Sequence, residues 1–94
     1  MKSQNVESRL LATHISNNKD FEVACMSGDA DMIVSIINSE MDKNKLFTKG
    51  SQKLRDDVLR MTQGKAKISS RMGNNILAFV WNSRLSGIGL AVAS

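Results

Sequence analysis

The sequence predicts an all-α fold, in which one compact domain holds four to five short helices in an orthogonal or bundle-like arrangement. Three observations predict it. The 94 residues contain no proline, so nothing interrupts helical hydrogen bonding. Three Phe and one Trp supply the aromatic area, and so small an area disfavours a core built from strands. Apolar residues recur at helical spacing along most of the chain.

The first predicted helix covers residues 3–16. Its apolar positions Val6, Leu10, Leu11 and Ile15 fall on one side of a helix. The pair 17–18, Asn-Asn, is expected to end it, because asparagine tolerates the left-handed conformation at a helix C-terminus.

Two short elements follow. Asp20 is expected to cap a helix over 20–27 that ends at Gly28, although the alternation in 21–26 also fits a strand. Asp29 or Asp31 then caps a second helix, whose apolar face is Ile33, Ile36, Ile37 and Met41. Residues 24–38 resemble the helix–turn–helix core of one ankyrin repeat. No second copy follows, so the pattern indicates only a helix hairpin.

A polar link over 42–52 leads to the next helix. Thr48 or Ser51 is expected to cap that helix, and Gly64 to end it. Its core positions are Leu54, Val58 and Met61. Asp56 and Arg60, four residues apart, are expected to form an ion pair on its exposed face.

The last predicted helix is the longest, and we expect it to end at Gly87. One apolar stripe consists of Ile68, Met72, Ile76, Phe79 and Val80, and a second consists of Leu77, Trp81 and Leu85. Because it is apolar on two sides, we expect this helix either to be the central one or to pack on a second chain. The uncharged apolar tail 87–94 is expected to dock on the domain, on another copy or on a partner.

Charge divides the chain into an acidic half, 1–47, and a basic half, 48–86. Residues 1–47 hold five Lys/Arg and seven Asp/Glu, and residues 48–94 hold eight Lys/Arg and two Asp/Glu. The basic segment 49–75, with its central glycine, resembles a helix-turn-helix and predicts contact with the phosphates of DNA or RNA. The residues expected to bind nucleic acid are Lys49, Lys53, Arg55, Lys65, Lys67, Ser70, Arg71, Asn74 and Asn75.

Other interpretations of the same residues stay open. The basic residues are also explained as a solvated face that keeps the domain soluble. A protein partner or a homo-oligomer is the alternative function, with an apolar interface formed by Leu77, Trp81, Leu85, Ile88 and Leu90. Binding of a membrane surface by the cationic C-terminal third ranks below both.

Catalysis is not predicted. His14, beside aliphatic residues, and Cys25, between Ala24 and Met26, are expected to be structural, although a pairing of the two in space stays open. One His and one Cys do not make a zinc site, and we expect no cofactor or small-molecule substrate. The first residues lack the apolar run typical of a signal peptide, and the apolar C-terminal stretch is interrupted and too short to span a membrane. Because the single cysteine also fits a reducing compartment, we expect a cytoplasmic protein. Size and composition suggest an accessory protein of a phage or mobile element.

Overall fold

A computed structural model describes the backbone of residues 2–45 and 49–93, and the side chains of residues 9–43, 45 and 49–84. Within these residues the chain forms five helices, and the predicted all-α fold is confirmed. The helices are α1 (Lys2–Ser16), α2 (Lys19–Ser27), α3 (Ala30–Asn44), α4 (Lys49–Thr62) and α5 (Ser70–Ala93). Residues 21–26, for which a strand was the alternative, are helical.

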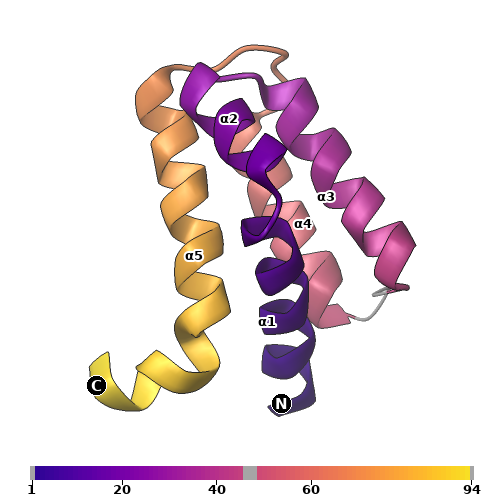
Figure 1. Ribbon diagram of the computed structural model, residues 1–94, viewed down its shortest axis with the longest axis vertical. Helices are drawn as coiled ribbons and strands as arrows, with labels where there is room; N and C mark the ends of the chain where they lie inside the picture. The colour runs from indigo at the N-terminus through magenta and orange to yellow at the C-terminus, as the bar shows by residue number, and fades with distance from the viewer. Residues whose placement is uncertain (1, 46–48, 94) are drawn as a thin grey trace.

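The central helix is α1, not the last helix. It packs most extensively against α5 and α4, and it also contacts α2 and α3. In Figure 1, α1 stands between α5 on one side and α3 and α4 on the other. Its Leu11, Ala12 and Ile15 side chains are fully buried. The expectation that α5 is central was wrong, because α5 packs on α1 and α2 and more weakly on α4, and it forms an edge of the molecule in Figure 1.

Buried apolar side chains from all five helices form one core. The predicted positions on α3 and α4 contribute as expected, apart from Met61, which is only partly buried, and α2 contributes Phe21, Ala24 and Cys25. Leu10 is 42% exposed, because Leu11 and Ile15, and not Leu10, lie on the side of α1 that packs into the core. Val6 lies outside the described side chains. The residues that pack around the edge of the core are Met61, Ile68, Met72, Leu77 and Phe79.

Two helix starts show how the first turns are fixed. The side chain of Asn18, not Asp20, caps α2, because its Oδ1 accepts a hydrogen bond from the backbone N–H of Asp20 at 2.9 Å. Asn18 is therefore extended, with φ of −90°, and is not left-handed as predicted. Asp29 caps α3 as predicted, accepting from the N–H of Met32 at 3.1 Å.

Helix α4 begins at Lys49, as the first of its two predicted caps, Thr48, implies, although Thr48 itself lies outside the described residues. The alternative cap was wrong, because Ser51 lies buried inside the helix. One predicted helix end was also wrong. Helix α5 continues past Gly87 to Ala93, so residues 87–93 extend the helix and do not form a separate tail. One glycine lowers helix stability by only about 1 kcal/mol, which an apolar continuation can tolerate. Whether this end docks depends on side chains outside the described set.

Candidate nucleic-acid interface

The link between α4 and α5, residues 63–69, is fixed to the turn between α2 and α3. The N–H of Ile68 donates to the carbonyl oxygen of Gly28 at 2.9 Å, and the N–H of Ala30 donates to that of Ala66, also at 2.9 Å. Asp29 and Lys67 thus face each other in an antiparallel bridge. Figure 1 shows this link crossing the end of the molecule above α2. The backbone that carries Lys65 and Lys67 is therefore held in place.

Three exposed cations gather on this link and on the first turn of α5: Lys65, Lys67 and Arg71. Among the described residues, none of their side chains makes an ion pair or a hydrogen bond. The sequence contains no acidic residue after Asp57. Asp29 lies opposite Lys67, but one of its carboxylate oxygens already accepts the capping hydrogen bond of α3. We call Lys65, Lys67 and Arg71 the link cations.

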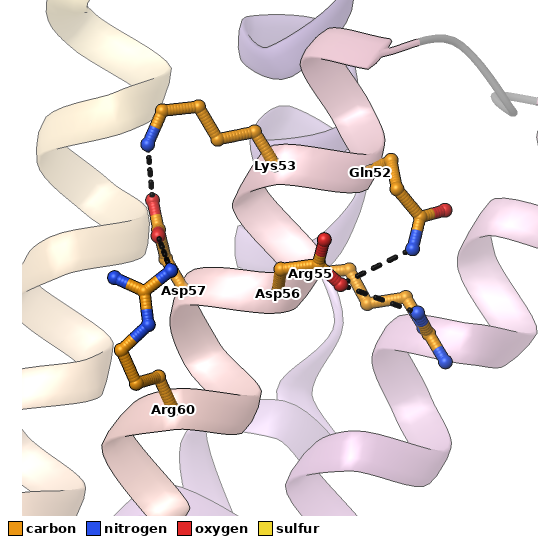
Figure 2. Close-up of polar contacts among 6 residues, drawn as sticks. All are labelled: Gln52, Lys53, Arg55, Asp56, Asp57 and Arg60. Atoms are coloured by element: carbon orange, nitrogen blue, oxygen red, sulfur yellow. Dashed lines mark hydrogen bonds and ion pairs between the residues drawn. The ribbon is translucent and has the colours of Figure 1, made fainter.

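Three basic side chains of α4, those of Lys53, Arg55 and Arg60, differ, because acidic neighbours on the same helix form ion pairs with them. Lys49, at the start of α4, is exposed and has no ion-pair partner among the described residues. Asp57 accepts Lys53 at 3.2 Å and Arg60 at 3.3 Å. Arg55 and Asp56 lie on the other side of the helix from Asp57 (Figure 2). A guanidinium nitrogen of Arg55 lies 3.5 Å from a carboxylate oxygen of Asp56, and Arg55 Nε donates to Asn38 Oδ1 of α3 at 2.7 Å. Lys53 and Arg55 were predicted to bind phosphate, and the structure gives both of them partners within the chain.

The expected pair between Asp56 and Arg60 was wrong. Arg60 reaches Asp57, three residues before it, while Asp56 accepts a hydrogen bond from Gln52 at 3.2 Å (Figure 2). Lys53, four residues before Asp57, completes the arrangement around that carboxylate. The spacings of three and four residues are those at which helical side chains meet, so more than one pairing was open.

The two helices do not form a helix-turn-helix. That motif joins its helices by a turn of about three or four residues, whereas here the whole of 63–69 separates Thr62 from Ser70. Helix α4 and helix α5 run in opposite directions along the long axis in Figure 1. Gln63 and Gly64 both have positive φ, 52° and 72°, so the helix ends at Thr62, two residues before the predicted glycine. The link cations thus come from a loop anchored elsewhere in the fold.

The outer side of α5 is polar and exposed. Arg71, Asn75, Ala78 and Asn82 follow one another at helical spacings of four, three and four residues, with Asn74 beside them. Helix α5 begins at Ser70, and the preceding Ser69 caps it, because its Oγ accepts a hydrogen bond from the N–H of Met72 at 3.1 Å. Asn74 and Asn75 were predicted site residues, while Ala78 and Asn82 were not, although the same spacing could have revealed them. We call Arg71, Asn74, Asn75, Ala78 and Asn82 the outer face of α5.

Three asparagines on this face lower the stability of the helix, and no hydrogen bond among the described residues offsets the loss. Asparagine inside a helix is less favourable than alanine by up to ~0.7 kcal/mol per residue. Among the described residues, the amides of Asn74, Asn75 and Asn82 have no hydrogen-bond partner. Asn18 and Asn38, in contrast, each bond to another helix, through Glu40 and Arg55.

The predicted apolar interface is only partly described. Leu77 and Trp81, with Phe21 and Ala78, line a groove of about 490 Å³ between α2 and α5. Trp81 is 46% exposed, and the Arg84 guanidinium lies 4.7 Å from the centre of its ring. Leu85, Ile88 and Leu90 belong to α5, but their side chains lie outside the described set. Sequence reasoning missed the exposed apolar side chains of Val23, Met26 and Met32, which no periodicity distinguishes from core positions.

Cys25 and His14 differ in their exposure to solvent. His14 is exposed, whereas Cys25 is fully buried, and this burial, followed by the Glu22 carboxylate, raises the pKa of Cys25 to about 12. A nucleophilic cysteine needs a lowered pKa, so this thiol has the wrong protonation state for that role. In the described part of the chain no group of three or more His, Cys, Asp and Glu could hold a metal ion.

The raised pKa of Cys25 predicts a loss of stability at alkaline pH. The unfolded chain loses the thiol proton near the ordinary pKa of 9.0, while the folded chain keeps it until about 12. This contribution is therefore complete below about pH 9 and declines as the pH rises, by at most about 1.4 kcal/mol per pH unit. Urea unfolding at pH 8, 9 and 10 should show a steeper decline for the wild type than for Cys25→Ala. Parallel declines would contradict the assignment.

The described helices include none that is long and apolar enough to cross a membrane. No protein-family model matches the chain, and neither does any curated protein or solved structure. Fold and surface therefore define a class, a small all-α protein with an anchored basic link, and the function has to be argued from that surface.

Proposed function

We propose that this chain is a small, non-enzymatic, nucleic-acid-associated protein that contacts phosphate through its link cations. The observation that carries the proposal is that Lys65, Lys67 and Arg71 are exposed and have no ion-pair partner among the described residues. Cations without partners can replace the counterions of a phosphate backbone, which provides most of the affinity for nucleic acid. A cytoplasmic location is part of the same proposal.

The anchoring of the link supports this proposal. Two backbone hydrogen bonds, from Ile68 to Gly28 and from Ala30 to Ala66, already fix the loop, so binding costs less ordering of the backbone. Ser70 and Arg71 are exposed residues in the first turn of α5, and a helix N-terminus favours an anion. Lys53 and Arg55 are assigned a smaller part than the sequence suggested, because Asp57, Asp56 and Asn38 engage them.

Replacing the link cations should abolish most of the binding. We expect Lys65→Gln, Lys67→Gln and Arg71→Gln together to weaken binding to a 20-base-pair DNA on the order of 10²-fold near 0.1 M salt. The slope of log affinity against log salt should become shallower by roughly three. Fluorescence anisotropy at several salt concentrations measures both quantities.

The matched control is a second triple variant with the same change in net charge. Lys19→Gln, Lys43→Gln and Lys45→Gln alter exposed cations at the start of α2 and the end of α3, none of which was predicted to bind nucleic acid. This variant should keep the wild-type slope within about one. If both variants lose affinity equally, binding depends on net charge alone and the proposed site is wrong.

A protein-interaction role is the second candidate, and the groove beside Trp81 favours it. Trp81 is nearly half exposed over an apolar groove, where a second copy or another protein could bury it. The molecular mass in solution tests the homo-oligomer form of this candidate. A dimer that becomes a monomer in Trp81→Ser supports it, and a wild-type monomer at high concentration counts against it.

A further inference from the structure

We propose that the outer face of α5 enters the major groove of duplex DNA, where Asn75 and Asn82 contact base edges. This inference rests on the proposed function and extends it from phosphate binding to the reading of bases. It concerns residues that the link cations do not include, apart from Arg71, which belongs to both. The phosphate contacts of Lys65 and Lys67 would hold the start of α5 against the duplex.

The position of α5 permits this approach. It packs on α1 and α2 and more weakly on α4, and Figure 1 shows its other side along the edge of the molecule. The major groove admits a single α-helix. At about 1.5 Å of rise per residue, the distance from Arg71 to Asn82 spans roughly 16 Å, or about five base pairs. Asn75 and Asn82 are two helical turns apart and lie in line along the outer face, so they are the central amides. Asn82, like Asn74, also borders the groove beside α2, whereas Asn75 does not.

The composition of the face is unfavourable for the helix and suitable for bases. The amides of Asn75 and Asn82 have no partner among the described residues, and asparagine disfavours helix. The other unfavourable residue of this segment, Gly73, has a packing reason, because a Cβ there would clash with the Cys25 carbonyl. An asparagine amide pairs with the two major-groove atoms of adenine, and Arg71 can pair with guanine.

Duplex DNA fits this surface better than the other nucleic acids. Single-strand binding proteins stack bases on aromatic side chains, and among the described side chains Trp81 is the one exposed aromatic residue. Duplex RNA has a deep, narrow major groove that side chains cannot read. Charge agrees as well, since the outer face of α5 carries no acidic residue and adjoins Lys65 and Lys67.

The test compares nucleic acids and variants on the full chain. A pool of random 20-base-pair DNA duplexes is selected against the protein, and the best duplex is compared with its single strand and with the RNA duplex of the same sequence. We expect a selected sequence that contains adenine, and a duplex-DNA preference of at least about tenfold over either competitor. Asn75→Ala with Asn82→Ala should reduce that preference at least about tenfold and leave the salt slope unchanged.

The variants separate this inference from the proposed function. Alanine favours helix, so loss of folding does not explain an effect of the asparagine variants. Asn17→Ala, an exposed asparagine outside α5, is the matched control and should bind like the wild type. Salt-dependent binding with no selected sequence, or with equal affinity for the three nucleic acids, overturns the inference while the proposed function stands. Absence of salt-dependent binding to all three overturns the proposed function itself.

Discussion

Gly73→Ala is expected to destabilise the protein by about 2–3 kcal/mol, although alanine is the better helix former. A Cβ at this position would lie 1.8 Å from the carbonyl oxygen of Cys25 and 2.9 Å from its carbonyl carbon. These are backbone atoms of α2, so no side chain can move aside and the two helices must separate. The separation would also open the core around Ile76, which is fully buried on the next turn of α5.

The sign of the change makes this prediction decisive. Helix propensity alone predicts that Gly73→Ala stabilises the protein by about 1 kcal/mol. Asn75→Ala is the matched control on the same helix, and its gain of a few tenths of a kcal/mol should be visible because nothing packs on it. Urea unfolding of both variants measures the difference. A Gly73→Ala protein more stable than the wild type would contradict the close packing of α2 and α5.

Gly28→Ala is expected to destabilise the protein by about 3 kcal/mol, and Gly64→Ala by about 1 kcal/mol. Both glycines are left-handed, with φ of 74° and 72°, so the conformational cost of a side chain is similar at the two positions. They differ in their surroundings. A Cβ on Gly28 would lie 2.3 Å from the carbonyl oxygen of Ile68, whereas a Cβ on Gly64 would have nothing within 4 Å.

The difference between these two variants reports the anchoring of the link. A new Cβ on Gly28 pushes against residue 68, which is also the residue that donates to the Gly28 carbonyl. Loss of that hydrogen bond would free the segment that carries Lys65 and Lys67. Urea unfolding gives the two stabilities, and amide hydrogen exchange at Ile68 and Ala30 shows whether the two bonds open. Equal destabilisation would mean that the link is not held by this turn.

Local signals were sufficient to predict the helices. Apolar spacing located the five segments, and the capping oxygen of Asp29 was predicted because an acidic residue before an apolar run is a strong start signal. Asp20 had the same chemistry and failed, because Asn18, two residues earlier, already supplies the capping oxygen. When two cap candidates lie only two residues apart, the backbone conformation is needed to decide which of them caps the helix.

Which helix lies at the centre of the fold was not predictable from the apolar stripes of the sequence alone. Helix α5 has more apolar residues than α1, so the sequence suggested that α5 is central. Leu11, Ala12 and Ile15 of α1 are fully buried, and which helix is covered on most sides depends on how the helices fit together in three dimensions. Gly87 failed as a terminator for a related reason, since glycine ends a helix only where the backbone turns left-handed.

The general position of the candidate site was predicted from the sequence, but ion pairs within the chain engage part of the predicted basic surface. Seven cations over 49–71 suggested one basic surface. The spacing of Lys53, Asp57 and Arg60 already permits local pairing, so part of the division was visible in the sequence. The anchoring of residues 63–69 was not visible, because it depends on backbone hydrogen bonds between residues 40 apart, from Ile68 to Gly28, and 36 apart, from Ala30 to Ala66. Such long-range pairing leaves no local pattern.

The most direct test of the central claim is the salt dependence of DNA binding by the wild-type protein. Three phosphate contacts by Lys65, Lys67 and Arg71 predict that log affinity for a DNA duplex falls linearly with log salt, with a slope of roughly −3 or steeper. The Gln variant of these three residues should make the slope shallower by roughly three. No detectable binding at low salt, or a slope that this variant leaves unchanged, would contradict the claim that the link cations bind phosphate.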